Sequence, residues 1–282
     1  MNDPIKIGFI DYYLDEWHAN NYPEMFRKNS NGRYKVCCAY GKIDHPGGGI
    51  TNCEWAEKYG IKLAGSIEQV IEESDRLIVL SPDNPEMHEE LCDLPLKSGK
   101  LVYVDKTFAT DKKTAEKIFA NADAHGTKCY SSSALRFASE YSSVDTSEID
   151  RIYSEGPGTF EIYRIHQIEP IVMLMNSRAK RVMYIGDERH PSMIIEFADG
   201  RCAQMYHRTD KTDSFRITTV NKENVAKYHL VQSDYFSLFI DGVIKFFDTG
   251  VIPVPHECTI DVVGIIEASI KAEKKPFTWV AV

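Results

Sequence analysis

The chain has 282 residues, enough for two domains of ordinary size that each bury a core of their own. Hydrophobic residues make up 43% of the sequence and charged residues 27%, which is typical of a soluble globular protein. The net charge of −9 and the absence of a long basic cluster argue against nucleic acid or an anionic membrane as a partner.

The sequence contains no window approaching the roughly 18 consecutive apolar residues of a membrane span. Its first residues lack the basic and apolar regions of a signal peptide, so we expect a cytoplasmic protein. The seven cysteines include no C-x-x-C pair, which favours reduced thiols in a protein core over a disulfide framework or a zinc site. We therefore expect no metal.

Up to about residue 131, short apolar runs alternate with helical patterns. The runs expected as strands are 5–10, 34–39, 76–80, 101–104 and 128–130. The segments between them carry helix signals, among them a Ser66-to-Gln69 capping box and a cap at Thr110 or Asp111. Such repetition requires crossover connections, so we expect a doubly wound parallel sheet.

Ligands of such sheets bind at the carboxyl ends of the strands. In this chain those ends are followed by four segments, 11–16, 40–49, 81–84 and 105–107. They contain the strand-end candidates for a ligand site, Asp11, Tyr13, Ser81, Asn84, Asp105 and Lys106.

After residue 137 the pattern changes. A helix-length apolar segment, 162–175, precedes alternating runs at 181–185, 192–197, 201–207, 215–220 and 224–231. Ala198-Asp199-Gly200 predicts a hairpin turn. Two closing helices and a last short strand, 277–282, complete a predicted α+β domain with a mostly antiparallel sheet. The predicted domains are thus 1–136 and 137–282.

Several segments in this order resemble the glucose-fructose oxidoreductase and inositol dehydrogenase family (Gfo/Idh/MocA). Residues 102–109, VYVDKTFA, are similar to the family's Glu-Lys-Pro segment, and Arg136 follows the last parallel strand as in the family. Residues 156–169, GPGTFEIYRIHQIE, resemble its glycine-rich lead into a helix with a catalytic Asp and His. Residues 246–250 and 266–269 are similar to its closing helices.

The resemblance implies a Rossmann-type domain followed by an open-sheet domain, and an oxidoreductase that uses NAD or NADP on a small sugar, polyol or sugar acid. It implies catalytic roles for Lys106 and His166. The positions it places near the cofactor, together with the strand-end candidates, are Asp11, Tyr13, His18, Ser81, Asn84, Asp105, Lys106 and Arg136.

The chain departs from the family at several positions. The three glycines of the family's G-x-G-x-x-G loop fall on Asp11, Tyr13 and Glu16, and its following histidine falls on His18. The second strand ends in Tyr40-Gly41 rather than in an acidic residue. Further along, the catalytic Asp position falls on Ile162, beside Glu161, and Thr107 replaces a proline.

Lys106 and His166 suit the oxidation of an alcohol. An ammonium can donate to a substrate hydroxyl, and an imidazole can take its proton. Glu169, at i+3 from His166, is expected to orient the ring, and Glu161 could replace the missing Asp only if the backbone rotates. The alternatives are a solvated lysine and a hydrogen-bonded core histidine.

The opening loop argues the other way. The Tyr13 ring should block the approach of a pyrophosphate, and Asp11 and Glu16 add like charge. The glycine run 45–52 is either a substitute anion site at a helix start or a surface loop. The alternative function is therefore a non-catalytic relative that serves ligand sensing or assembly. A small-molecule substrate and a homodimer or homotetramer are the expected partners.

Overall fold

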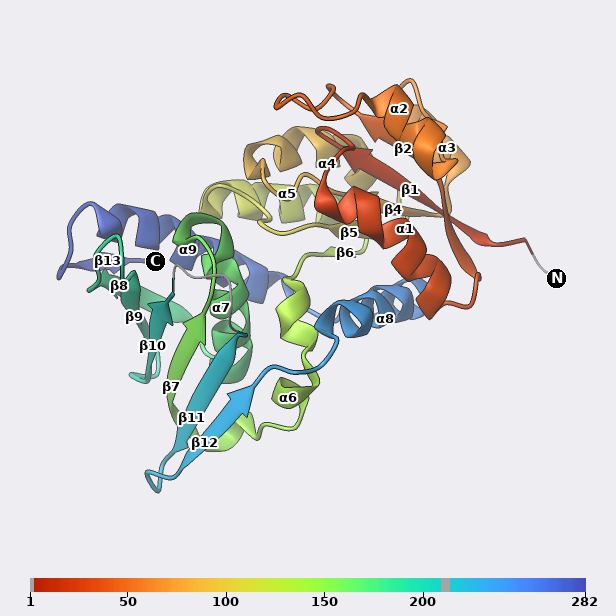
Figure 1. Cartoon of the computed structure of the whole chain (residues 1–282). Coiled ribbons are helices and arrows are strands. Elements are labelled where there is room, and N and C mark those ends of the chain that lie inside the picture. The colour runs from red at the N-terminus through yellow and green to blue at the C-terminus, as the bar shows by residue number, and fades with distance from the viewer. Residues whose placement is uncertain (1–2, 209–213) are drawn as a thin grey trace. The chain divides into compact units, whose positions relative to one another are not determined.

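The computed structural model describes residues 3–208 and 214–282 (Figure 1). Its contacts define two compact units, Met1–Ser132 with Ile240–Pro255, and Ser133–Phe239 with His256–Val282. The sequence had assigned 133–136 to the first domain and 240–255 to the second. The second of these segments belongs to the first unit because the rings of Phe246 and Phe247 pack against Tyr130, Phe26 and Tyr34.

The first unit is built on a six-stranded parallel sheet in the order β3-β2-β1-β4-β5-β6. Its strands are β1 (Ile5–Asp11), β2 (Tyr34–Gly41), β3 (Lys62–Leu63), β4 (Arg76–Val79), β5 (Val102–Val104) and β6 (Cys129–Tyr130). The intervening helices are α1 (Trp17–Asn29), α2 (Asn52–Tyr59), α3 (Ile67–Glu73), the 3-10 turn η1 (Pro85–Met87), α4 (His88–Lys97) and α5 (Lys112–Ala124). The expected doubly wound sheet is confirmed.

Strand register brings the candidate segments of this unit to one edge. Asp11 at the end of β1 pairs with Gly41 of β2, and Ile10 pairs with Val79 of β4. Val79 in turn pairs with Val104, which immediately precedes Asp105. The loops that follow β1, β2, β4 and β5 therefore start side by side.

The second unit contains a seven-stranded sheet in the order β12-β11-β7-β10-β9-β8-β13, in which only the β10–β7 pairing is parallel among the described residues. Its strands are β7 (Ile149–Gly156), β8 (Ala179–Tyr184), β9 (Ser192–Phe197), β10 (Cys202–His207), β11 (Arg216–Asn221), β12 (Ala226–Leu230) and β13 (Trp279–Ala281). This confirms the mostly antiparallel sheet and the hairpin at Gly200.

Helices α7 (Phe160–Met175) and α9 (His256–Glu273) pack against each other and against this sheet (Figure 1). The buried guanidinium of Arg164 joins them, because it donates to Ser269 Oγ at 2.9 Å and pairs with Glu273 at 2.5 Å. The remaining elements are η2 (Ala134–Phe137), α6 (Ser139–Ser142), η3 (Thr146–Glu148) and α8 (Tyr235–Thr249). Within the described ranges, no helix is long and apolar enough to cross a membrane.

Two strands were not predicted. β3 has only two residues, both exposed, so it carries no apolar signal. β7 lies in the interior of its sheet, yet its sequence IDRIYSEG buries only alternate residues and includes charged ones on the other face. A charged outer face hides a central strand from a search for apolar runs.

A close contact fixes the packing of α3 on β1. A Cβ on Gly8 would collide with Ser74 Oγ and Val70 Cγ1, and Val70 is fully buried. We expect Gly8→Ala to lower the free energy of unfolding by about 1–3 kcal/mol, since overpacking forces side chains and backbone apart. Gly65→Ala is the control, because its nearest neighbour is Gln69 Oε1 at 3.7 Å. Equal urea midpoints for both variants would contradict this packing.

Candidate functional site

The opening loop ends at Glu16, which caps helix α1 with its own side chain. The Glu16 backbone is extended, and its carboxylate accepts hydrogen bonds from the N–H groups of His18 at 2.7 Å and of Ala19. These N–H groups have no partner within the helix and attract anions. The carboxylate of Glu16 therefore stands where the third glycine of a phosphate loop would leave room for a ligand.

Three carboxylates gather beneath this loop. Asp11, Glu16 and Asp105 are 1%, 8% and 1% exposed. Burial raises the pKa of Asp11 well above its usual range, and Glu16 and Asp105 add to this by repulsion. Burial also raises the pKa of Glu16, to about 7, although His18 opposes the shift. Asp11 Oδ2 makes no hydrogen bond within the part of the chain that the structure describes.

Asp105 is the carboxylate that stays ionised. Burial would raise its pKa, but the adjacent His18 and Lys106 outweigh this and hold it at about 2. His18 Nδ1 lies 2.7 Å from Asp105 Oδ2, and the hydroxyl of the buried Tyr103 donates to Oδ1 at 3.2 Å. His18, which falls at the family's histidine position, is thus ion-paired to a strand-end carboxylate.

Tyr13 lies among these acids. Its ring makes an edge contact with His45, with centroids 4.6 Å apart. Partial burial raises the pKa of its hydroxyl, with further contributions from Asp83, Asp11 and Glu16. The ring thus turns toward the loop after β2 and lies within the influence of carboxylates from two strand ends.

The loop after β2 is bound to the opening loop through Asn52. This side chain accepts from Leu14 N at 3.0 Å and donates to the carbonyls of Ile43 at 2.7 Å and Gly41 at 3.2 Å. Asp15 Oδ2 accepts from Ile50 N at 3.1 Å. The two loops are therefore joined by the chain's own polar groups.

The glycine run does not provide a substitute anion site. Thr51 and Glu54 form a complete capping box at the start of α2, and Asp44 Oδ1 accepts from Asn52 N at 2.7 Å. Asp44, Thr51 and Glu54 thus satisfy the start of this helix, which favours the surface-loop alternative.

These residues do not fit the diphosphate of a dinucleotide in its usual position. The N–H groups of α1 are held by Glu16, two further carboxylates lie next to them, and the ring of Tyr13 takes the place of a glycine. A doubly charged group placed there would meet like charge at low dielectric.

Lys106 occupies the same edge of the sheet, after β5. It is only 8% exposed. Its ammonium donates to Pro82 O at 3.3 Å and lies 3.9 Å from Asp83 Oδ1, both in the loop after β4. An ammonium has three N–H donors, and within the described ranges only this one hydrogen bond is formed. A buried cation with donors to spare is unlike a solvated surface lysine.

Sequence reasoning missed His88, which ties the turn after Lys106 to the end of β4. Its ring is fully buried; Nε2 faces Leu80 O, and Nδ1 lies 3.0 Å from Thr107 O and 3.1 Å from Phe108 O. Burial lowers the pKa of His88, whereas these carbonyls oppose the shift. The sequence feature that could have identified His88 is its position three residues before the buried Leu91 of the same helix.

The other two candidates of this edge, Ser81 and Asn84, bond within their own loop. Ser81 has a φ of 83°, and its Oγ donates to Asn84 O at 3.0 Å. Asn84 Nδ2 donates to Glu86 Oε1 at 2.9 Å, so this amide points along the chain toward α4. Asn84 makes no side-chain cap, and the helix begins as a 3-10 turn.

In the second unit, His166 lies on α7 next to Ser133. Its Nδ1 is 2.8 Å from Ser133 Oγ, and its ring makes edge contacts with Tyr163 and Phe215. Glu169, expected to orient His166, pairs with Arg136, whose Nη1 lies 3.1 Å from Glu169 Oε1. Burial raises the pKa of Glu169 although Arg136 opposes the shift.

Ser133 was missed, and its signal was the run of three serines directly after β6. It also accepts from Leu135 N at 3.2 Å, which fixes its side chain at the start of η2. Glu161 and Ile162 are exposed, as expected for neighbours that point away from the buried face of α7.

A second network, also missed, fixes the glycine-rich lead into α7. His207 Nε2 bonds to Gly158 O at 2.9 Å, and its Nδ1 accepts from Gln167 Nε2 at 2.9 Å. Gln167 Oε1 accepts from Ser154 Oγ at 2.9 Å. Burial lowers the pKa of His207 to about 4, so the ring is neutral and serves structure.

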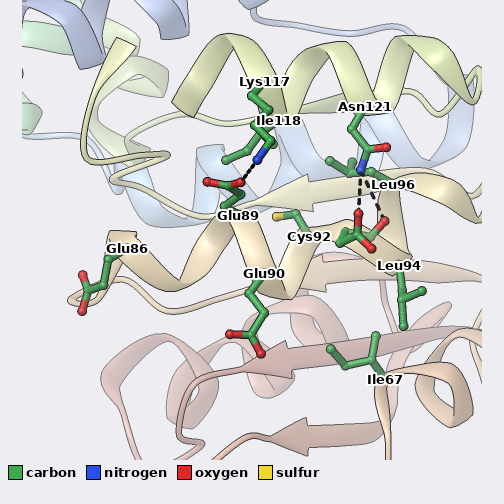
Figure 2. A pocket seen from close by; sticks show the side chains of 11 residues that line it. Ile67, Glu86, Glu89, Glu90, Cys92, Leu94, Leu96, Lys117, Ile118 and Asn121 are labelled. Carbon is green, nitrogen blue, oxygen red and sulfur yellow. Dashed lines mark hydrogen bonds and ion pairs between the residues drawn. The ribbon is translucent and has the colours of Figure 1, made fainter. Parts of the chain in front are cut away.

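The first unit also contains a groove with a different lining. A groove of about 820 Å³ runs between α3, α4 and α5, and none of its lining residues is a predicted site residue (Figure 2). Three of its four acids are paired with lysines, Glu89 with Lys117, Glu90 with Lys42, and Asp93 with Lys97, and Glu86 accepts from Asn84 Nδ2. We find no feature in this groove that points to a ligand.

Comparison with known proteins supports the fold. No protein-family model and no curated protein matches the sequence. GenD2 from gentamicin A biosynthesis, solved in complex with NAD, has a TM-score of 0.78 at 13% identity, covering 100% of this chain and 97% of that one. A scyllo-inositol dehydrogenase from Lactobacillus casei with bound NAD(H) and scyllo-inositol has a TM-score of 0.77 at 14% identity, covering 99% of each chain.

A myo-inositol 2-dehydrogenase from Lactobacillus plantarum is similarly related, with a TM-score of 0.76 at 13% identity, covering 99% of this chain and 100% of that one. At such identities the likeness shows the fold alone. It confirms the expected Rossmann-type sheet followed by an α+β domain, as in these dehydrogenases.

The acid cluster makes stability depend on pH. The pKa of Glu16 is about 7 when folded, against 4.5 when unfolded, so folding retains a proton in that range. Its contribution to stability is complete below about pH 4.5 and is lost as pH rises through about 7, on the order of 1–3 kcal/mol. Urea titrations should therefore show Glu16→Gln gaining stability relative to the wild type from about pH 5 to 8.

Glu24→Gln is the matched control on the same helix, because Glu24 is fully exposed and pairs only with Arg27 among the described residues. Its stability relative to the wild type should not change over this pH range. A Glu16→Gln variant that tracks the wild type at every pH would show that Glu16 is ionised throughout.

Proposed function

We propose that the chain is an oxidoreductase that uses a nicotinamide cofactor, NAD or NADP, to oxidise or reduce a small hydroxylated substrate such as a sugar, polyol or sugar acid. The observation that carries this proposal is the placement of Lys106, a buried ammonium at the carboxyl edge of the sheet with donors to spare. The fold shared with proteins solved with NAD supports the cofactor class.

Lys106 suits a role in substrate activation. Its Nζ can donate to a hydroxyl or carbonyl oxygen and stabilise the negative charge that develops there, an effect that grows in a buried site. His88 holds the turn that follows Lys106 through the carbonyls of Thr107 and Phe108, so the ammonium starts from a fixed backbone. These contacts would keep the entropic cost of orienting the ammonium low when a substrate binds.

His166 suits proton transfer. When Nδ1 carries the hydrogen and donates to Ser133 Oγ, Nε2 is the basic nitrogen of the ring and can accept a proton from a hydroxyl. The rings of Tyr163 and Phe215 flank the imidazole, and Tyr163, 38% exposed, offers apolar surface of the kind that packs against the C–H groups of a sugar or polyol. Ser133 would then act as a positioning residue that selects the tautomer.

Titration with NADH and NADPH, followed by fluorescence and calorimetry, tests this proposal. We expect binding in the micromolar to millimolar range, and the reduction or oxidation of polyols and their ketones in a screen. Lys106→Met and His166→Ala should lower kcat by about 10²-fold or more with little change in cofactor binding. Glu24→Gln is the control for both variants.

Absence of binding of either cofactor at millimolar concentration would overturn the cofactor class. Unchanged turnover in both variants would show that the chemistry is carried by other residues. Because Lys106 and His166 belong to different units, each variant reports on its own unit.

A non-catalytic role in ligand sensing or assembly is the second candidate. The cap that Glu16 places on α1 favours it, because an anion site filled by the protein itself is a poor site for a cofactor. Failure to bind either dinucleotide under any condition, combined with binding of a sugar or polyol, would favour this function.

We also propose that the protein is a homodimer or homotetramer formed through the second sheet. One cross-strand row on its outer face consists of Tyr228, Thr218, Tyr153, Gln204, Ile194, Met183 and Trp279. Tyr228 and Tyr153 are 58% and 49% exposed. Aromatic and aliphatic side chains in such a row are typical of an interface core.

Tyr153→Glu tests the interface, since a buried unpaired charge at its centre should dissociate it. Light scattering at about 10 μM should give a multiple of 32.1 kDa for the wild type and a smaller mass for the variant. Val251→Glu is the control, because Val251 is 66% exposed and belongs to the first unit. A monomeric wild type, or equal masses for all three proteins, would contradict the proposal.

A further inference from the structure

We propose that Glu16 occupies, with its own carboxylate, the anion site that this fold offers to the diphosphate of a dinucleotide, and that it thereby limits the affinity of the chain for such cofactors. The inference rests on the proposed use of a nicotinamide dinucleotide. Glu16 would then be the residue that governs cofactor binding at the opening loop.

The geometry is that of a bound anion. The two carboxylate oxygens of Glu16 are divided between two consecutive N–H groups at the start of a 13-residue helix, Oε2 with His18 N at 2.7 Å and Oε1 with Ala19 N. A ligand phosphate at a helix start makes the same kind of contact. A diphosphate can therefore bind there only after the Glu16 side chain has left.

The surroundings of Glu16 make its charge costly. The titratable groups that face it are Asp11 from β1, Asp105 after β5, Tyr13 from the loop, and His18 and Tyr22 from α1. His18 is the one basic side chain among them, and its Nδ1 lies 2.7 Å from Asp105 Oδ2 and 3.6 Å from Glu16 Oε2. The raised pKa of Glu16 means that the carboxyl group holds its proton up to about pH 7. Below that pH it is a neutral polar cap.

Asp11 provides a second observation that points to a ligand. It is 1% exposed, and its Oδ2 makes no hydrogen bond within the described part of the chain. The first glycine position of the loop thus holds a buried acid beside Glu16, with Oδ1 accepting from Tyr12 N at 2.7 Å and Oδ2 unsatisfied among the described residues. Two acids in one apolar site share their protons, and a neutral pair removes the repulsion that a diphosphate would meet.

The test is calorimetry with NAD⁺ on the full chain, because NAD⁺ itself has no group that titrates near neutral pH. We expect Glu16→Gln to bind NAD⁺ at least about tenfold more tightly than the wild type at pH 8, since one like charge is gone and an amide oxygen is a weaker competitor for N–H groups. We expect wild-type affinity to rise about tenfold from pH 8 to 6, and that of Glu16→Gln to stay level.

Glu16→Ser serves as a second variant if Glu16→Gln fails to fold, because serine is a good helix cap that carries no charge. Glu24→Gln should match the wild type at every pH. Equal NAD⁺ affinity of the wild type and the folded Glu16 variants, whether measurable or absent, would overturn the inference. A wild-type affinity that does not change between pH 6 and 8 would also overturn it.

This test and the test of the proposed function can fail independently. Tighter NAD⁺ binding by Glu16→Gln in a protein without turnover would refute the oxidoreductase and keep the inference. Turnover by the wild type with unchanged binding in Glu16→Gln would do the opposite.

Discussion

The start of helix α1 sets the constraint on which the rest of the first unit depends. A helix start has N–H groups without partners, and in this position the fold aims them at the crevice where ligands bind. Dinucleotide-binding proteins leave the groups for a ligand by using glycines. Here Glu16 supplies the anion from within the chain, so the helix is complete without a ligand.

Several neighbouring features follow from the position of the Glu16 carboxylate at the start of α1. A carboxylate at the helix start shares one electrostatic site with Asp11 and Asp105, and His18 lies beside two of the three acids, Asp105 and Glu16. The loop after β2 closes over the opening loop through Asn52. Lys106, which directly follows Asp105 on the same edge of the sheet, has the opposite charge. Its surroundings do not fully satisfy the donors of this ammonium.

The sequence predicted the fold well because its strands and helix caps are local signals. The expected runs at 34–39 and 192–197 lie within or match β2 and β9, and the cap at Asp111 is present. β7 escaped prediction because a strand with one polar face carries little apolar signal. The strand order required the paired registers, which no single segment contains.

The candidate site was predictable in its positions but not in its partners. Strand ends identified Lys106 and Asp105, and the likeness to a phosphate loop identified Asp11, Tyr13 and Glu16. The sequence could not show that Glu16 folds back onto the backbone of His18, that Ser133 contacts the His166 ring, or that His88 fixes the turn after Lys106. Such pairings depend on side-chain directions that only the packed fold determines.

The cap on α1 also bears on how such a loop can change during evolution. Glutamate and aspartate codons become glycine codons through a single base change, whereas a tyrosine codon needs two, so a change to glycine takes more steps at Tyr13 than at Asp11 or Glu16. A glycine at position 16 would leave the helix start without its internal partner. The first carrier of that change would therefore fold best in a cell rich in a suitable anionic metabolite, and selection for folding would become selection for binding.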